Sequence, residues 1–516
     1  MRGLMRSLGK MVSTSSSRRS RSRRGSAYCP SLECLEGRCL LSGNVLQTNL
    51  VSDLPGVAAN LDSHLVNPWG IATAPGGPFW VSDNNAGVST LYDTSGMPQK
   101  LVVSIPIPGD PTGTSGTPTG TVFNIGPANS FEVTGFNGAG NSVSVKSVFL
   151  FATEDGTIVG WNPGVNPVTN PAKPGTYGII AVDQSGNNFT EPDPHKQAGA
   201  VFKGMAIANG TVTPTNPNGL IFSGDTNSQS VVYVTNFRAG TVEAFDTQFH
   251  QIPLTGGAFT DPSLPHDYAP FNIQVLGDKV YVTYAKQNST RHDDDAGPHR
   301  GFVDVFNLDG TGEQRLITRG PLDSPWGLAI APPKFGDLGG ALLVGNFGNG
   351  HINAFNATTG DFITELKDPD GEPITIDGLW ALRVGTGGKG GDPNLVYFTA
   401  GLFDETHGLF GSLTAAAPGS DEGMAEEQMV RASLDVFEMN VATVANDLQS
   451  GTPMAMVRQD VKALENSFRQ LVNDEVRLII DELGEGNQAA AQAHIQELEA
   501  VEALNDGILD QVHEQH

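Results

Sequence analysis

Short apolar runs, separated by glycine- and asparagine-rich breaks, dominate the chain from residue 45 to residue 415. One unit recurs six times: a strand ending at a polar break, then a strand ending in an aromatic residue. Such spacing is typical of antiparallel β-hairpins. The six copies span residues 79–93, 149–162, 232–246, 280–307, 342–356 and 396–411.

A second pattern precedes most of these hairpins and predicts one further strand per repeat. It is clearest in Asn-Pro-Trp-Gly-Ile-Ala at 67–72 and Ser-Pro-Trp-Gly-Leu-Ala at 324–329, with looser copies at 202–206, 269–273 and 377–381. Repeated four-stranded sheets around an axis form a β-propeller. We therefore predict an all-β, six-bladed β-propeller over 45–415, closed by Val45–Val51 as the outer strand of the last blade. Two separate β domains are the alternative.

Each predicted blade is long. Dividing 45–415 by six gives roughly 62 residues per blade, against ~40–50 in compact propeller repeats. The excess is expected in Gly/Pro/Thr-rich loops at 106–120, 162–175 and 385–394.

The pattern changes near Met424, where apolar residues recur at steps of three and four. This period predicts α-helices. Breaks at 450–453, with Thr452 as N-cap, and at 484–487 divide the tail into three helices. The third covers 488–512, with its inward positions at Ile495, Leu498, Val501, Leu504 and Ile508. A three-helix appendage and self-association through 421–516 as a coiled coil are both compatible with this pattern.

Charge divides the chain into the same parts. Residues 1–44 hold nine basic and two acidic residues, 416–516 hold five and twenty, and the whole chain carries −26. We predict a disordered basic leader at 1–44, the propeller at 45–415 and an acidic helical domain at 416–516. The acidity argues against nucleic acid as a partner, and no apolar run is long enough for a membrane span.

All three cysteines, at 29, 34 and 39, lie in the leader. A disulfide, a thiolate nucleophile and a cysteine zinc site are therefore excluded after residue 44. The segment Ser31–Ser42 resembles the LE-x-R-x-LLS sorting segment of planctomycete surface and secreted proteins, with Gly37 where proline is usual. This resemblance implies an extracytoplasmic location.

The motifs around Asn67-Pro68-Trp69-Gly70-Ile71 and Trp80-Val81-Ser82-Asp83-Asn84 resemble an uncharacterised bacterial propeller family. The resemblance runs through most of 45–415. It implies the fold and export, and it carries over no activity or catalytic residues.

Candidate ligand-binding residues follow from the predicted topology. The start of each inner strand and the end of the next strand share one rim of the propeller. Side chains expected there to bind a small molecule, glycan or protein are Asn67, Trp69, Asp83, Asn84, Asn236, Trp326, Asn346, Asp377 and Trp380. The alternatives are turn hydrogen bonds for the polar residues and packing between blades for the tryptophans.

Candidate metal ligands are Glu154 and Asp155 at the same rim, and His292, Asp293 and Asp295 in the insertion of the fourth repeat. Carboxylates and amides suit Ca²⁺ or another divalent cation. The six-bladed hydrolases related to gluconolactonases hold a central metal with Glu, Asn and Asp, and the resemblance here is by residue type only. A solvated loop is the alternative for the insertion.

The sequence therefore leaves three functions open. The favoured one is an exported propeller that acts as a ligand- or partner-binding scaffold. A divalent-metal-dependent lactone or ester hydrolase and a cell-surface protein assembled through its tail are the alternatives. No catalytic residue is assigned, because no G-x-S-x-G, H-E-x-x-H or P-loop motif occurs.

Overall fold

A computed structural model describes most of the chain after the leader. It covers residues 44–416 except 112, 114–115, 167–175, 187–198, 211–228, 255 and 369–370. In the tail it covers 422–450, 454–485 and, within 494–512, all but 496–497, 499–500, 506 and 510. The leader with its cysteines and sorting-like segment, and the cap at Thr452, lie outside the described residues. Residues 44–54 and 58–416 belong to one compact unit, and the tail after 417 belongs to a second.

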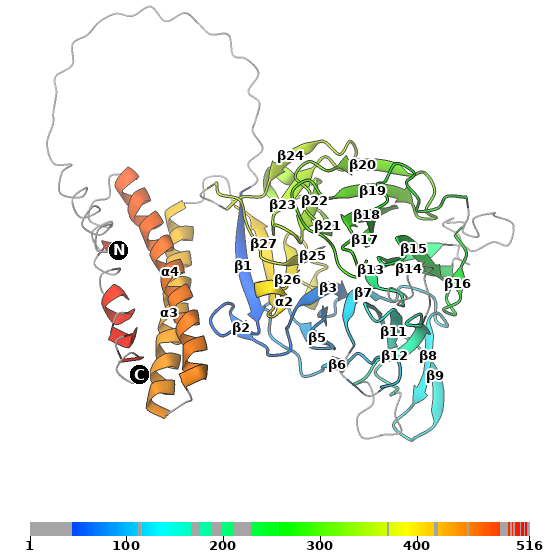
Figure 1. Ribbon diagram of the computed structural model, residues 1–516, viewed down its shortest axis with the longest axis horizontal. Coiled ribbons are helices and arrows are strands. Elements are labelled where there is room, and N and C mark those ends of the chain that lie inside the picture. Colours follow the sequence, from blue (N-terminus) through cyan, green and yellow to red (C-terminus); the bar gives the residue numbers. More distant parts are fainter. Residues whose placement is uncertain are drawn as a thin grey trace, which may run out of the picture. The chain divides into compact units, whose positions relative to one another are not determined.

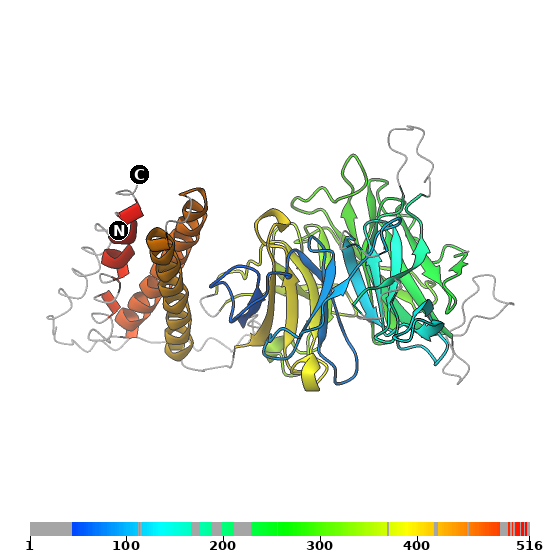
Figure 2. The same ribbon diagram turned by 90° about the horizontal axis from the view of Figure 1, so that it is seen from below.

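Six sheets circle a common centre in the first unit, as Figure 1 and Figure 2 show. The predicted six-bladed β-propeller is confirmed. Blade one contains β3 (Pro68–Thr73), β4 (Phe79–Asp83), β5 (Val88–Tyr92) and β6 (Val103–Ser104). Blade two contains β7 (Pro118–Phe123), β10 (Phe149–Thr153), β11 (Thr157–Trp161) and β12 (Ile179–Asp183). Blade three contains β13 (Phe202–Gly210), β14 (Gln229–Asn236), β15 (Thr241–Phe245) and β16 (Gln251–Ile252).

The remaining blades follow the same order from the centre outward. Blade four contains β17 (Tyr268–Leu276), β18 (Lys279–Lys286), β19 (Phe302–Asn307) and β20 (Gln314–Thr318). Blade five contains β21 (Pro325–Ile330), β22 (Leu342–Asn346), β23 (Ile352–Phe355) and β24 (Phe362–Glu365). Blade six contains β25 (Leu379–Val384), β26 (Val396–Ala400), β27 (Leu409–Ala415) and β1 (Val45–Ser52), with β2 (Asn60–Leu61) beside β1.

The strand β1 closes the ring, as the sequence predicts. It pairs antiparallel with β27, from Val45 opposite Ala415 to Ser52 opposite Leu409. Val45, Leu50 and Val51 are buried. The first residues of the propeller therefore complete its last blade, which leaves no gap in the ring.

Neighbouring inner strands lie unusually close, and this explains the repeated Trp-Gly. A Cβ on Gly70 would lie 2.5 Å from the carbonyl oxygen of Thr119 in blade two. A Cβ on Gly327 would lie 2.6 Å from the carbonyl oxygen of Trp380 in blade six. Only glycine permits this approach.

Two elements of blade two were not predicted. The inner strand β7 includes Pro118–Gly120, which the sequence assigns to a loop, so that part of the loop prediction is wrong. A two-stranded hairpin, β8 (Glu132–Phe136) and β9 (Ser142–Lys146), is inserted between β7 and β10. Short 3₁₀ turns η2 (Gly336–Leu338) and η3 (Gly388–Gly390) and the turn α2 (Leu402–Glu405) complete this unit.

The second unit is helical. It contains α3 (Glu422–Ser450) and α4 (Met454–Glu485), and the described residues of 494–512 are helical too. Val430, Phe437, Leu464 and Leu471 share one buried cluster with Val501, Ile508 and Val512, so the apolar stripes pack against one another within the unit. This favours the three-helix arrangement. Leu504 is exposed, so its predicted inward position is wrong.

Candidate functional site

One aromatic or polar residue of each inner strand lies at the same strand position near the axis. In blades one and five this position is the tryptophan of Trp-Gly, which is Trp69 and Trp326. In β13 it is Lys203 of Lys-Gly, and in β7 it is Thr119 of Thr-Gly. Trp69 stacks on Trp380 with ring centroids 3.5 Å apart. Trp326 meets both rings edge-on, at 6.1 Å from Trp69 and 5.8 Å from Trp380. The three tryptophans therefore form a buried layer at the axis. This arrangement agrees with the alternative in which the tryptophans pack between blades.

Lys203 is the charged residue of this layer. Its side chain is 2 % exposed, and its ammonium contacts Glu154 Oε1 and lies 3.4 Å from Asp293 Oδ1. The ammonium also lies 4.8 Å from the centroid of the Trp69 ring, a cation–π arrangement. Burial lowers the pKa of Lys203, but the two carboxylates more than offset this and raise the pKa above its ordinary value. The residue is therefore an internal cation.

Asn67 connects the tryptophan layer to the rim. Its Oδ1 accepts a hydrogen bond of 2.9 Å from Trp380 Nε1, and its Nδ2 donates one of 2.6 Å to Glu405 Oε2. The backbone of Asn67 has a φ of +50°, a conformation that asparagine tolerates better than most residues. Ser324, before the second Pro-Trp-Gly, has a φ of +47°.

Glu405 reaches the rim from a strained turn. Phe403, Asp404 and Glu405 have φ values of +53°, +52° and +63°. Left-handed backbone costs non-glycine residues roughly 1–2 kcal/mol each. The turn is held by the Phe403 N–H, which donates to Asp377 Oδ2 at 2.7 Å. Such strain persists where the surrounding structure enforces it, and it is concentrated at functional sites.

Six polar residues therefore meet at one end of the axis, and we call them the mouth cluster. Blade one supplies Asn67 and Asn84, blade two Glu154, blade three Lys203, the insertion of blade four Asp293, and the turn between β26 and β27 Glu405. Asn84 Nδ2 donates to Glu154 Oε2 at 3.0 Å.

The two outer carboxyls of the mouth cluster have opposite pKa shifts. Burial, reinforced by the Glu154 charge, raises the pKa of Glu405 from 4.5 to about 7, against the hydrogen bond from Asn67. For Asp293, burial is outweighed by the His292 hydrogen bond and the Lys203 charge, which lower the pKa to about 2. Near neutral pH, Asp293 is ionised and Glu405 is close to its midpoint.

The other predicted ligand residues are held in local contacts. Thr90 donates to the buried Asp83 at 2.7 Å, Asn236 Nδ2 donates to Glu243 at 2.7 Å, and Asn346 Nδ2 donates to the Pro321 carbonyl at 2.8 Å. These contacts agree with the alternative in which the polar residues make local hydrogen bonds at turns. Asp377 holds the Phe403–Glu405 turn, and a ligand role for any of these residues stays a prediction.

The predicted metal ligands separate into three places. Ligand atoms of Glu154, His292 and Asp293 lie within 4.8 Å of one another, so the structure brings these three together. Asp155 instead accepts 2.9 Å and 3.0 Å hydrogen bonds from the N–H and hydroxyl of Thr117. Asp295 pairs with Lys286 at 2.6 Å and with Arg300 at 2.7 Å. A second acidic group of Asp261, Asp304 and Glu313 lies in and beside blade four.

A resident divalent ion fits the Glu154–His292–Asp293 group poorly. Glu154 Oε1 and Asp293 Oδ1 already face the Lys203 ammonium, and His292 Nδ1 is 2.7 Å from the same Asp293 oxygen. A cation placed there would stand next to a fixed positive charge. The central metal implied by the likeness to gluconolactonase-type hydrolases is therefore not supported by this residue set.

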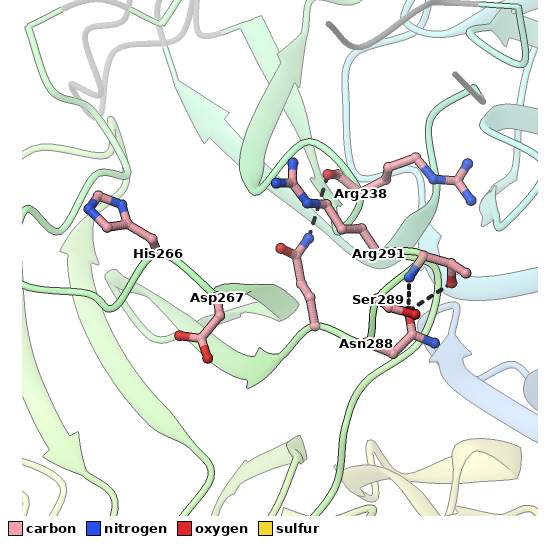
Figure 3. Close-up of a pocket in the computed structure, with 8 residues that line it drawn as sticks. Arg238, His266, Asp267, Asn288, Ser289 and Arg291 are labelled. Carbon is pink, nitrogen blue, oxygen red and sulfur yellow. Dashed lines mark hydrogen bonds between the residues drawn. The ribbon is translucent and has the colours of Figure 1, made fainter. Parts of the chain in front are cut away.

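Two hollows lie at blades three and four. One, of about 300 Å³, lies beside the blade-four insertion. Figure 3 shows Arg238 and Arg291 on one side of it and His266 and Asp267 across from them. The other, of about 690 Å³, lies between the two blades and shares Arg238 and Arg291 with the first.

Lys203 and Glu405 are the functional candidates that the sequence analysis missed. Lys203 could have been found, because it stands where Trp69 and Trp326 stand in the repeat. Glu405 gives no such signal, since it depends on a left-handed turn in a segment without glycine at those positions.

Comparisons with known proteins place the chain in a family of uncharacterised proteins. No protein-family model matches it. The "Uncharacterized protein R648" of Acanthamoeba polyphaga mimivirus is 31 % identical over 369 residues, which are 70 % of this chain and 78 % of that protein. The "Uncharacterized protein L690" of the same virus is 31 % identical over 369 residues, which are 70 % of this chain and 84 % of that protein.

Solved structures resemble the propeller only distantly. Virginiamycin B lyase from Staphylococcus aureus aligns with 72 % of this chain and 99 % of its own, at 11 % identity and a TM-score of 0.35. Regucalcin from Agrobacterium tumefaciens, described as a calcium-binding protein, aligns with 72 % of this chain and 96 % of its own, at 12 % identity and a TM-score of 0.37. The sequence relationship is the closer one, and the chain belongs to the same family as the mimivirus proteins R648 and L690.

Proposed function

We propose that this protein is a ligand-binding propeller whose site is the mouth cluster, and that its ligand carries a positively charged amine. The observation that carries the proposal is the arrangement of donors and acceptors. The donor Lys203 is 2 % exposed in its side chain, whereas the Asp293 side chain is 57 % exposed. Glu154 and Asp293 already face Lys203, so the proposed amine pairs with Glu405, whose Oε2 accepts a hydrogen bond from Asn67.

The strained turn supports a binding role over a purely structural one. Phe403–Glu405 holds a carboxyl whose burial costs free energy whenever it is ionised. Stability alone gives no reason to maintain such a group. A bound ammonium would offset this cost by pairing with the ionised Glu405.

Binding should depend on pH because Glu405 must ionise. Its ionised fraction, and with it the apparent affinity, should rise up to about tenfold between about pH 6 and about pH 8. We expect isothermal titration calorimetry with spermidine to show this increase, and Glu405→Gln to remove it. The contribution of Glu405 is the part of the pH dependence that this variant abolishes.

A matched control is Glu372→Gln, which changes an exposed carboxyl away from the mouth cluster. It should leave both the affinity and its pH dependence as in the native protein. An affinity for spermidine that is flat with pH, or no binding heat at either pH, would contradict the proposal.

The hydrolase alternative has one observation in its favour, the proximity of Glu154, His292 and Asp293. The position of Lys203 among these groups weighs against it.

Export also belongs to this proposal, and its support is the sorting-like segment Ser31–Ser42. None of the helices in the described part of the chain is long and apolar enough to cross a bilayer.

A further inference from the structure

Arg383 lies toward the end of the axis that faces away from the mouth cluster. The inner strand β25 begins beside the mouth, where Trp380 joins the tryptophan layer, and Arg383 is its last residue but one. Thr73, the last residue of β3 in blade one, accepts a hydrogen bond of 3.1 Å from Arg383 Nη2. It also accepts one of 3.2 Å from the hydroxyl of Thr386, which follows β25. We call Arg383, Thr73 and Thr386 the distal cluster.

Arg383 has no counter-charge within the part of the chain that the structure describes. Its guanidinium donates to two neutral oxygens, Thr73 Oγ1 and, at 3.4 Å, the carbonyl of Ile71. No described carboxylate forms an ion pair with it, and its Nε is buried without a hydrogen-bond partner among the same residues. Arg315 of blade four shows the usual arrangement, since its Nε donates to Asp304 Oδ1 at 2.6 Å.

The missing carboxylate makes Arg383 costly to the fold. Burial lowers the pKa of Arg383 from 12.5 to about 10, so the side chain still carries its charge at neutral pH. A buried charge without a partner destabilises a folded protein. The chain has 56 acidic residues against 30 basic ones, yet none of those that the structure describes pairs with this guanidinium. Because Arg383 keeps part of its surface exposed, an anionic ligand can supply the missing charge.

The connection after β25 is almost free of side chains. Its sequence from 385 to 391 is Gly-Thr-Gly-Gly-Lys-Gly-Gly, without an acidic residue. The backbone of this connection lies against the distal cluster, because a Cβ on Gly390 would lie 2.3 Å from Thr386 Oγ1 and 3.3 Å from Thr73 Cγ2. Backbone N–H groups in tight turns often bind phosphate and other anions. The surroundings of Arg383 therefore favour an anion over a cation.

We propose that the distal cluster binds an oxyanion, the phosphate or carboxylate group of a small ligand. A guanidinium pairs with two oxygens of such a group at once, and threonine hydroxyls can donate further hydrogen bonds to it. The ligand neutralises a charge that the described chain leaves unpaired. This site lies at the opposite end of the axis from the mouth cluster and does not depend on its amine ligand.

The test is thermal unfolding of the full chain, followed by tryptophan fluorescence. All five tryptophans, at 69, 80, 161, 326 and 380, belong to the propeller unit, so the signal reports on that unit. The probes are sodium phosphate and sodium acetate, with sodium chloride at equal ionic strength as the reference. At saturation, at least one probe should raise the melting temperature by roughly 2–4 °C over the reference. The probe with the larger shift identifies the group as phosphate or carboxylate.

Arg383→Met removes the unpaired charge and keeps the length of the side chain. In chloride it should melt at or above the native temperature, because no ion pair is lost, and the shift with phosphate or acetate should disappear. Arg383→Lys keeps the charge without the planar fork, so its shift should be smaller than the native one. Arg319→Met is the control, because Arg319 is exposed on blade four and this variant should retain the full shift.

Three results would overturn the proposal: no shift over chloride with either probe, an equal shift in Arg383→Met, or a melting temperature of Arg383→Met in chloride clearly below the native one. The last result would show that the protein itself satisfies the guanidinium. Spermidine titrations of the same samples separate the two sites. An absent oxyanion shift with normal spermidine binding would refute the distal cluster alone, and the reverse would refute the mouth cluster alone.

Discussion

Replacing Lys203 by methionine should lower the free energy of unfolding by about 3–5 kcal/mol, the usual cost of removing one partner of a buried ion pair. Methionine keeps the length and apolar contacts of the side chain but leaves Glu154 and Asp293 facing each other without a cation. It also removes the contact of the ammonium with the Trp69 ring. Urea denaturation followed by tryptophan fluorescence measures the change.

Lys286→Met is the control for this prediction. Lys286 pairs with Asp295 at 2.6 Å, but both side chains are partly exposed, so the expected loss is at most about 1 kcal/mol. Equal losses in the two variants would show that Lys203 is no more than a surface ion pair. That outcome would contradict its role as the internal cation of the mouth cluster.

Val51→Asp should destabilise the propeller by about 4 kcal/mol or more, because it buries a carboxyl without a partner in the closing strand. Val51 is fully buried and lies opposite Phe410 in β27. With β1 detached, the outer edge of β27 would lose its pairing. The melting temperature and the elution volume on size exclusion report the change.

The same strand provides the control. Thr48 is exposed and lies opposite Ser412, so Thr48→Asp should change stability by no more than about 0.5 kcal/mol. If Val51→Asp behaved like Thr48→Asp, β1 would not be part of the ring that holds the mouth cluster together.

The hairpins of all six blades were predictable because apolar alternation and Gly/Asn breaks are local signals. The strand β7 was not, because its threonines replace apolar side chains with hydrogen bonds to the backbone. Thr119 Oγ1 donates to the Phe202 carbonyl of the next blade at 2.9 Å, and Thr121 Oγ1 to the Leu150 carbonyl at 3.1 Å. The Pro-Thr-Gly-Thr sequence at 118–121 therefore forms a buried inner strand, although its composition predicts a loop.

The candidate site was only partly predictable for a different reason. The expected rim correctly groups Asn67, Asn84 and Glu154, because strand direction alone determines which residues share it. The repeat places Lys203 where Trp69 and Trp326 stand, but its pairing with Glu154 of another blade depends on the closed ring. Contacts between distant parts of the chain, such as Asn67 with Glu405, depend on the closed ring.

The most direct test of the account is a crystal structure of the protein soaked in Mn²⁺, with anomalous data at the metal edge. The account predicts no anomalous peak between Glu154 and Asp293, and the Lys203 ammonium in density between them. A strong peak at that position, with Lys203 displaced from both carboxylates, would contradict the account and support a metal-dependent hydrolase.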